Sequence, residues 1–99
     1  MKNETYICVD VETAGPTPEK YAMLSIGACL VEDTSTTFYV EMKPDRSDFL
    51  SEALVISGLS MESLKEHGIA PQTAIQSFAD WINKIVPSES RPVLVALNA

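Results

Sequence analysis

The sequence has few of the residues that dominate redox sites and nucleic-acid-binding surfaces. It contains one histidine and two cysteines, and seven Lys and Arg stand against 14 Asp and Glu, a formal net charge of −7. Cys8 and Cys29 have no C-x-x-C spacing, which argues against a disulfide scaffold or a cysteine metal site and favours buried free thiols. An acidic chain does not hold nucleic acid mainly through a basic surface. The same charge is compatible with an enzyme whose carboxylates are neutralised locally by metal ions.

Long apolar runs are also missing. No stretch is long enough to span a membrane, and the first residues, M-K-N-E-T, lack the apolar core of a signal peptide, so we expect a cytoplasmic protein without a membrane partner. The chain has 99 residues, and its hydrophobic content of 45% and charged content of 21% are ordinary for a globular protein. This length allows one small domain, residues 1–99.

What the sequence does contain is a pair of acids inside an apolar run. Asp10 and Glu12 are two residues apart, so a strand directs both carboxylates to one face and Ile7, Val9 and Val11 to the other. A cation between two like charges lowers the cost of keeping both ionised beside a core. Oxygen ligands suit hard divalent ions, which predicts Mg²⁺ or Mn²⁺. The alternative is that both acids are simply solvated at a sheet edge.

The order of apolar and turn-forming segments predicts a mixed α/β sheet. We expect three strands, two short helices, one long helix and a last strand, at 5–12, 21–32, 36–42, 49–56, 61–66, 71–86 and 91–98. Short connections make the first three strands an antiparallel meander, and the helical crossover makes the last strand parallel to the first. This β-β-β-α-β order leaves one sheet face without a helix. Either another molecule covers that face or the chain is a piece of something longer.

Four further residues are interpreted as structural. Phe78 and Trp81 share the apolar stripe of the long helix, so we expect core anchors and not a base-stacking platform. Ser60 is expected to cap the second short helix. His67, the one histidine, invites a general-base role, but it stands at a helix end before Gly68, where a surface histidine is the norm. We therefore do not assign it to catalysis.

Four short motifs occur in an order that is typical of one enzyme superfamily. They are D-V-E-T-A-G at Asp10–Gly15, L-S-I-G-A at Leu24–Ala28, S-G-L-S at Ser57–Ser60 and V-A-L-N-A at Val95–Ala99. In this order the chain resembles the DnaQ-like DEDD superfamily of 3′–5′ exonucleases, which includes RNase T, oligoribonuclease and proofreading exonucleases. The resemblance implies an RNase H-like fold.

The resemblance has two departures. Leu97 stands where the superfamily commonly has His, and Asn98 is the remnant of a second motif whose Asp would follow Ala99. The third motif, with the last metal-binding Asp and its His or Tyr, is absent. We therefore expect a partial RNase H-like exonuclease domain that carries two of the four acids.

The resemblance also implies a chemistry. Asp10 would bridge two Mg²⁺ or Mn²⁺ ions and Glu12 would hold one of them, for hydrolysis of the 3′-terminal phosphodiester of single-stranded RNA or DNA. Thr13, Ala14 and Gly15 would approach the terminal nucleotide. We expect the fragment to be inactive without its missing acids and to form homo-oligomers through its uncovered face. The alternative is a non-catalytic RNase H-like module for partner binding or self-association.

Overall fold

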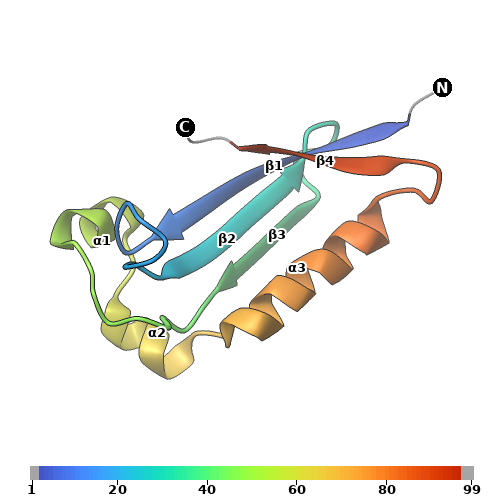
Figure 1. The fold of residues 1–99 in the computed structure, drawn as a ribbon. Coiled ribbons are helices and arrows are strands. Elements are labelled where there is room, and N and C mark those ends of the chain that lie inside the picture. The colour runs from blue at the N-terminus through green and yellow to red at the C-terminus, as the bar shows by residue number, and fades with distance from the viewer. Residues whose placement is uncertain (1–2, 97–99) are drawn as a thin grey trace.

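The computed structural model describes residues 3–96, in which four strands form one sheet and three helices pack beside it (Figure 1). In chain order the elements are β1 Glu4–Thr13, β2 Met23–Leu30, β3 Thr37–Glu41, α1 Ser51–Ser57, α2 Met61–His67, α3 Pro71–Ile85 and β4 Arg91–Ala96. The strand order is β3-β2-β1-β4, with β1 antiparallel to β2 and parallel to β4. The predicted meander and crossover are therefore confirmed.

The element ends differ from the predicted ones by a few residues. β1 is one residue longer at each end, whereas β2 covers 23–30 instead of 21–32 and β3 covers 37–41 instead of 36–42. Before β2, the Tyr21 backbone N–H donates to the Thr17 carbonyl at 2.9 Å and so belongs to the preceding turn. After β2, the Asp33 carboxylate accepts hydrogen bonds from Ser35 and Thr36 and holds the next turn. The predicted last residues of β4, 97 and 98, lie outside the described residues.

The helix ends follow local signals. Gly58 ends α1 in the left-handed conformation with φ 75°, which glycine adopts without a steric penalty. The Ser60 hydroxyl accepts a hydrogen bond from the Ser63 backbone N–H at 3.3 Å and caps α2, as predicted. Pro71 begins α3, where its missing N–H would be unpaired in any case.

One face of the sheet packs on α3, which runs along β3 (Figure 1). Phe38 of β3 lies 5.3 Å from Phe78 and 5.7 Å from Trp81, measured between ring centroids. These helix aromatics are therefore core anchors, as predicted. The buried residues of this layer are Ile26, Met42 and Ala74, with Ile7 also buried on β1. A second cluster joins β2 to α2 and contains Ala14, Ala22, Leu24, Met61 and Leu64.

The opposite face of the sheet has no helix over it in the described part of the chain, and we call it the open face. Strand alternation places Cys8, Asp10 and Glu12 of β1 on this face. Tyr39 of β3 and Val95 of β4 are also on it, with exposed fractions of 61% and 41%. The prediction that one face lacks a helix is confirmed.

The apolar strand β4 is more exposed than its sequence alone indicates. Its continuous apolar sequence indicates a strand covered on both sides. In the structure β4 is an edge strand that pairs only with β1 among the described residues, and Leu94 is 53% exposed although it lies on the α3 side. An apolar run predicts which residues avoid water but does not say whether a neighbour is present to cover them.

Candidate functional site

The two acids of the first motif lie on the central strand, side by side on the open face. Asp10 stands opposite Gly27 of β2, and Glu12 stands opposite Ser25. Both acids are half-buried. The register between β1 and β2 shifts between Glu12 and Thr13, and irregularities of this kind bend a strand and redirect the residues that follow. The shared face of the carboxylates is therefore confirmed, and they stand where β1 leaves the regular sheet.

Tyr39 is a neighbour of this acid pair that the sequence analysis missed. Its ring lies over Gly27, where an added Cβ would be 3.6 Å from the ring and 3.8 Å from the Asp10 carbonyl oxygen. The Tyr39 hydroxyl donates to Glu41 Oε2 at 2.7 Å. Burial raises the pKa of the Tyr39 hydroxyl, and the hydrogen bond to Glu41 and the negative charges of Glu41 and Glu12 raise it further. A hydrogen bond with Ser25 acts in the opposite direction and lowers this pKa. Asp10, Gly27 and Tyr39 are register partners on three neighbouring strands. A glycine between an acid and a tyrosine in this arrangement is the sequence feature that could have indicated the contact.

The loop after β1 is held tightly by the chain itself. Thr13 Oγ1 donates to the Gly15 carbonyl oxygen at 2.8 Å. Ala14 is fully buried, its N–H donates to the Ala22 carbonyl at 2.9 Å, and its carbonyl accepts from the Leu50 N–H at 2.8 Å. Ala14 therefore positions the loop, with its N–H donor already paired within the chain.

Gly15 is required by a close approach of the chain to itself. A Cβ built on Gly15 would lie 2.5 Å from both Cδ atoms of the Tyr21 ring. The expected approach of Gly15 to a terminal nucleotide stays a prediction, and a side chain at this position would meet the protein itself. In the structure the nearest group to that position is the Tyr21 ring.

A cleft of about 250 Å³ opens beside this loop. Its walls come from the loop, the start of β2 and the segment after β3, and they are formed by Thr13, Gly15, Pro16, Pro18, Tyr21, Met23, Asp45 and Arg46. Arg46 is the one cation among them and lies 3.5 Å from Asp45, measured from Nη1 to Oδ1. No sequence pattern predicts a binding role for Tyr21, Met23 or Arg46, because their approach to Thr13 depends on the fold.

The acid pair has part of what a metal ion requires. Within residues 3–96 neither Asp10 nor Glu12 forms a salt bridge, so both carboxylates keep their oxygen atoms available. No group of three or more His, Cys, Asp and Glu close enough to hold a metal ion occurs in the part of the chain that the structure describes. Hard oxygen donors fit Mg²⁺ or Mn²⁺, but two carboxylates are an incomplete ligand set. Asn98, the remnant of the second motif, lies outside the described residues.

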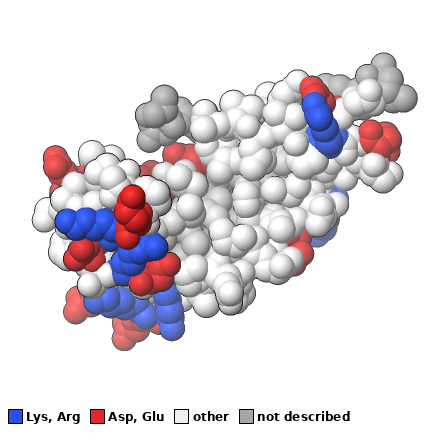
Figure 2. Space-filling view, in the orientation of Figure 1, with Lys and Arg blue, Asp and Glu red and all other residues white. Residues whose placement is uncertain are grey.

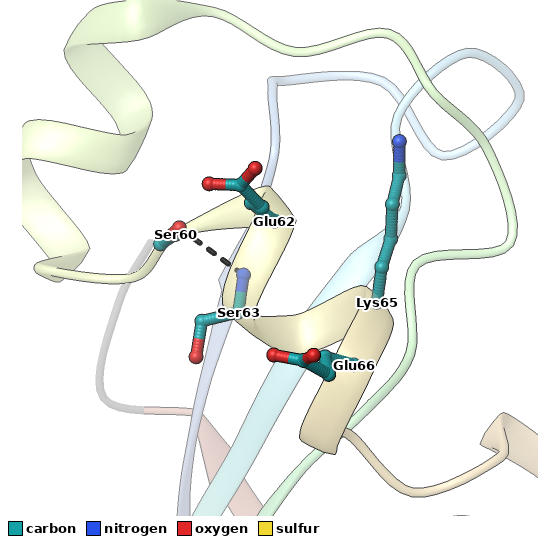
Figure 3. Close-up of a pocket in the computed structure, with 5 residues that line it drawn as sticks. All are labelled: Ser60, Glu62, Ser63, Lys65 and Glu66. Atoms are coloured by element: carbon teal, nitrogen blue, oxygen red, sulfur yellow. Dashed lines mark hydrogen bonds between the residues drawn. The ribbon is translucent and has the colours of Figure 1, made fainter.

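Two other polar features, a hollow along α2 and His67, contain none of the expected site chemistry. A hollow of about 490 Å³ lies along α2, lined by Ser60, Glu62, Ser63, Lys65 and Glu66, and it contains none of the predicted site residues (Figure 3). Figure 3 shows Ser60 occupied in capping the helix, and the hollow is an ordinary polar helix surface. His67 has a side chain 74% exposed beside Glu66, as expected for a surface histidine. In the view of Figure 2, Lys and Arg gather with acids over the end that holds α1 and α2.

The fold is that of the 3′-exonucleases. A full-length 3′-exonuclease superposes on the whole chain with a TM-score of 0.77 at 12% identity, and the matched part is 48% of that protein. The nuclease domain of 3′hExo, a DEDDh family member bound to rAMP, matches 95% of this chain and 52% of its own length, with a TM-score of 0.75 at 13% identity. Exonuclease I of E. coli in complex with a dT13 oligonucleotide matches 97% of this chain and 21% of its own, with a TM-score of 0.66 at 20% identity. The predicted RNase H-like fold is confirmed.

Sequence comparison gives a nearer relative. The chain is 44% identical over 96 residues to the 3′-5′ DNA exonuclease Cap18 of Escherichia coli, a match that covers 97% of this chain and 51% of Cap18. No family model matches the chain. The chain thus spans about half the length of this curated relative. The resemblance to the DnaQ-like DEDD exonucleases, and to only a part of them, is confirmed.

None of the helices in residues 3–96 combines the length and the apolar character that crossing a membrane requires.

Proposed function

We propose that this chain is the part of a metal-dependent 3′–5′ exonuclease domain that supplies its first two acids. The observation that carries the proposal is the placement of Asp10 and Glu12 together on the open face of the central strand, half-buried and without a salt bridge within the described residues. The sequence identity of 44% to a 3′-5′ DNA exonuclease supports it. The reaction would be hydrolysis of the 3′-terminal phosphodiester of a single strand. DNA is the substrate to test first, because the curated relative acts on DNA.

Each site residue has a proposed role. Asp10 and Glu12 hold divalent metal, Mg²⁺ or Mn²⁺, which when bound stabilises the charge that develops on the phosphate oxygens. Thr13 fixes the loop through its hydrogen bond to the Gly15 carbonyl, and the cleft beside the loop receives the terminal nucleotide. Arg46, at the edge of that cleft, offers a charge that complements phosphate. The chain has a net charge of −7, and Arg46 is the one cation among the residues that line this cleft.

We also propose that the 99 residues hold metal weakly and have little or no nuclease activity by themselves. Two carboxylates leave most of the coordination sphere to water, and a positioned pair of ions requires further ligands and a fixed surrounding shell. The missing ligands would come from the part of the domain that this chain does not contain.

Metal titration tests the role of the acids directly. We expect calorimetry or Mn²⁺ electron paramagnetic resonance to detect weak Mn²⁺ binding by the unchanged chain. Asp10→Asn should weaken it at least about fivefold, since one of two charged ligands is lost. Glu62→Gln, on the surface of α2, is the matched control and should leave the affinity unchanged. Equal binding by the unchanged chain and the Asp10→Asn variant would refute the site.

Nuclease activity is tested separately with a 5′-labelled single-stranded DNA. We expect no shortening from the 3′ end by the purified chain in Mn²⁺. Trimming that disappears in Asp10→Asn would support the exonuclease assignment and refute the inactivity of the fragment.

Self-association is a second proposed property, supported by the open face. Tyr39 and Val95 are 61% and 41% exposed there, and apolar surface of this kind favours burial against another protein. We expect a sedimentation coefficient that rises with protein concentration and falls again for Tyr39→Lys. A monomer at all concentrations would rule this property out.

A further inference from the structure

The two cysteines of the chain stand directly opposite each other on neighbouring strands. Cys8 of β1 is the register partner of Cys29 of β2, and the chain has no third cysteine. Both thiols are free, as expected, but they are half-buried and not buried. We propose that Cys8 and Cys29 form a reversible cross-strand disulfide by exchange with a small-molecule disulfide of the glutathione type.

The backbone separation suits this bond. The Val31 N–H donates to the Tyr6 carbonyl at 3.0 Å, which makes Tyr6 and Val31 a hydrogen-bonded pair of the antiparallel ladder. Because such pairs alternate along the ladder, the pair two residues further along β1, Cys8 and Cys29, is also hydrogen-bonded. Residues paired in this way have Cα atoms about 5.5 Å apart, which lies inside the range of about 4.4–6.8 Å found for disulfides.

The side-chain geometry explains why the bond would be reversible. Directly opposite residues have Cβ atoms about 4.5–5.5 Å apart, with hydrogen-bonded pairs toward the longer end, whereas disulfides prefer about 3.5–4.5 Å. Closing the bond therefore draws the two Cβ atoms, and with them β1 and β2, together locally by about 1–2 Å. A disulfide formed under such tension is reduced more easily than a relaxed structural one.

The exchange balances without any further reactant. The thiolate of one cysteine attacks a sulfur of oxidised glutathione, forms a mixed disulfide and releases one glutathione thiolate. The second cysteine thiolate then attacks the protein sulfur of the mixed disulfide and releases the second glutathione. Two thiol protons pass to the two leaving glutathione thiolates, and the two electrons given up by the protein sulfurs reduce the glutathione disulfide.

The position of the pair gives the modification a local consequence. Cys8 precedes Asp10 by two residues and lies on the same open face, while Cys29 follows Gly27, the partner of Asp10, by two residues. The bond would therefore tighten the strand pair one row away from Asp10. The proposal itself concerns bond formation and does not depend on nuclease activity.

The experiment is oxidation of the reduced, folded protein by oxidised glutathione, read by thiol counting and intact mass. We expect a monomer that has lost both thiols and two hydrogen atoms. The oxidised fraction should not change on dilution of the protein, because the bond is intramolecular, and dithiothreitol should restore both thiols. Cys8→Ser and Cys29→Ser should each stop at a mixed disulfide with glutathione.

A matched variant tests whether the two thiols must face each other or need only be present in the same chain. Cys29→Ala combined with Ala28→Cys keeps two cysteines but moves one to the α3 side of β2, where its partner is Val9. Circular dichroism confirms that the variant is folded, and its internal bond should form at least about tenfold more slowly. The proposal fails if the unchanged chain yields only glutathione adducts or disulfide-linked dimers, or if the displaced pair closes as readily.

Discussion

A methyl group added at Gly15 tests how the loop beside the acid pair is packed. In Gly15→Ala the new Cβ would lie 2.5 Å from two atoms of the Tyr21 ring, and ordinary contacts begin at about 3.4 Å. The ring must therefore retreat by roughly 1 Å. Tyr21 packs against the cluster that contains Leu24 and Leu64, so this movement disturbs the core under the loop. Overpacking of this kind typically costs about 1–3 kcal/mol of the free energy of unfolding.

Urea unfolding followed by the fluorescence of Trp81, the single tryptophan, measures this cost. Gly27→Ala is the control, because its Cβ would meet the Tyr39 ring at an ordinary 3.6 Å, and we expect a change within about 0.5 kcal/mol. In a Tyr21→Leu background the ring is gone, so the effect of Gly15→Ala should fall below about 0.5 kcal/mol. The reasoning is refuted if Gly15→Ala is harmless, or if its cost is the same with and without the tyrosine.

Three further predictions concern the elements that hold the site in place. Ser60→Ala removes the acceptor that caps α2 and should cost about 1 kcal/mol in urea unfolding, with Ser60→Thr recovering most of it; equal losses for both would contradict the capping role. Phe38→Ala removes a half-buried ring from the aromatic cluster with α3 and should cost about 2–3 kcal/mol, and a loss below about 1 kcal/mol would contradict the core assignment. Hydrogen bonding by the Ser35 hydroxyl lowers the pKa of Asp33, so the stability that this carboxylate contributes is complete above about pH 4 and is lost as the pH falls through the lowered pKa. Asp33→Asn should reduce the acid-induced fall in melting temperature between about pH 5 and pH 3, and an unchanged fall would contradict the assignment.

Features that depend on neighbouring residues in the sequence were predictable. The end of α1 at Gly58, the cap at Ser60 and the start of α3 at Pro71 each follow from the conformation or hydrogen-bonding capacity of one residue. The shared face of Asp10 and Glu12 follows from the two-residue period of a strand, which the extended backbone conformation sets locally. These parts of the fold and of the site required no knowledge of distant contacts.

Features that depend on distant residues were not predictable in the same way. The pairing of Cys8 with Cys29 depends on the register of two strands, and a slip by one residue would put the thiols on opposite faces. The exposure of β4 depends on which neighbour covers it, which its own apolar residues do not specify. The approach of Tyr21 to Gly15 closes a loop whose turn residues predict a bend but not the packing of a ring against it.

The strand order has a consequence for how the molecule is made. β1 is the second strand from one edge of the sheet, and β4 is the strand that forms this edge. The ion pair between Glu4 of β1 and Arg91 of β4 joins residues 87 positions apart in the sequence. During synthesis β1 can pair with β2 early, whereas its other edge has no partner until Arg91–Ala96 leaves the ribosome. Contacts of such long sequence separation form slowly, and an unpaired edge is available to strands of other chains in the meantime. The strand that carries both acids therefore keeps one edge open to mispairing until β4 has been made.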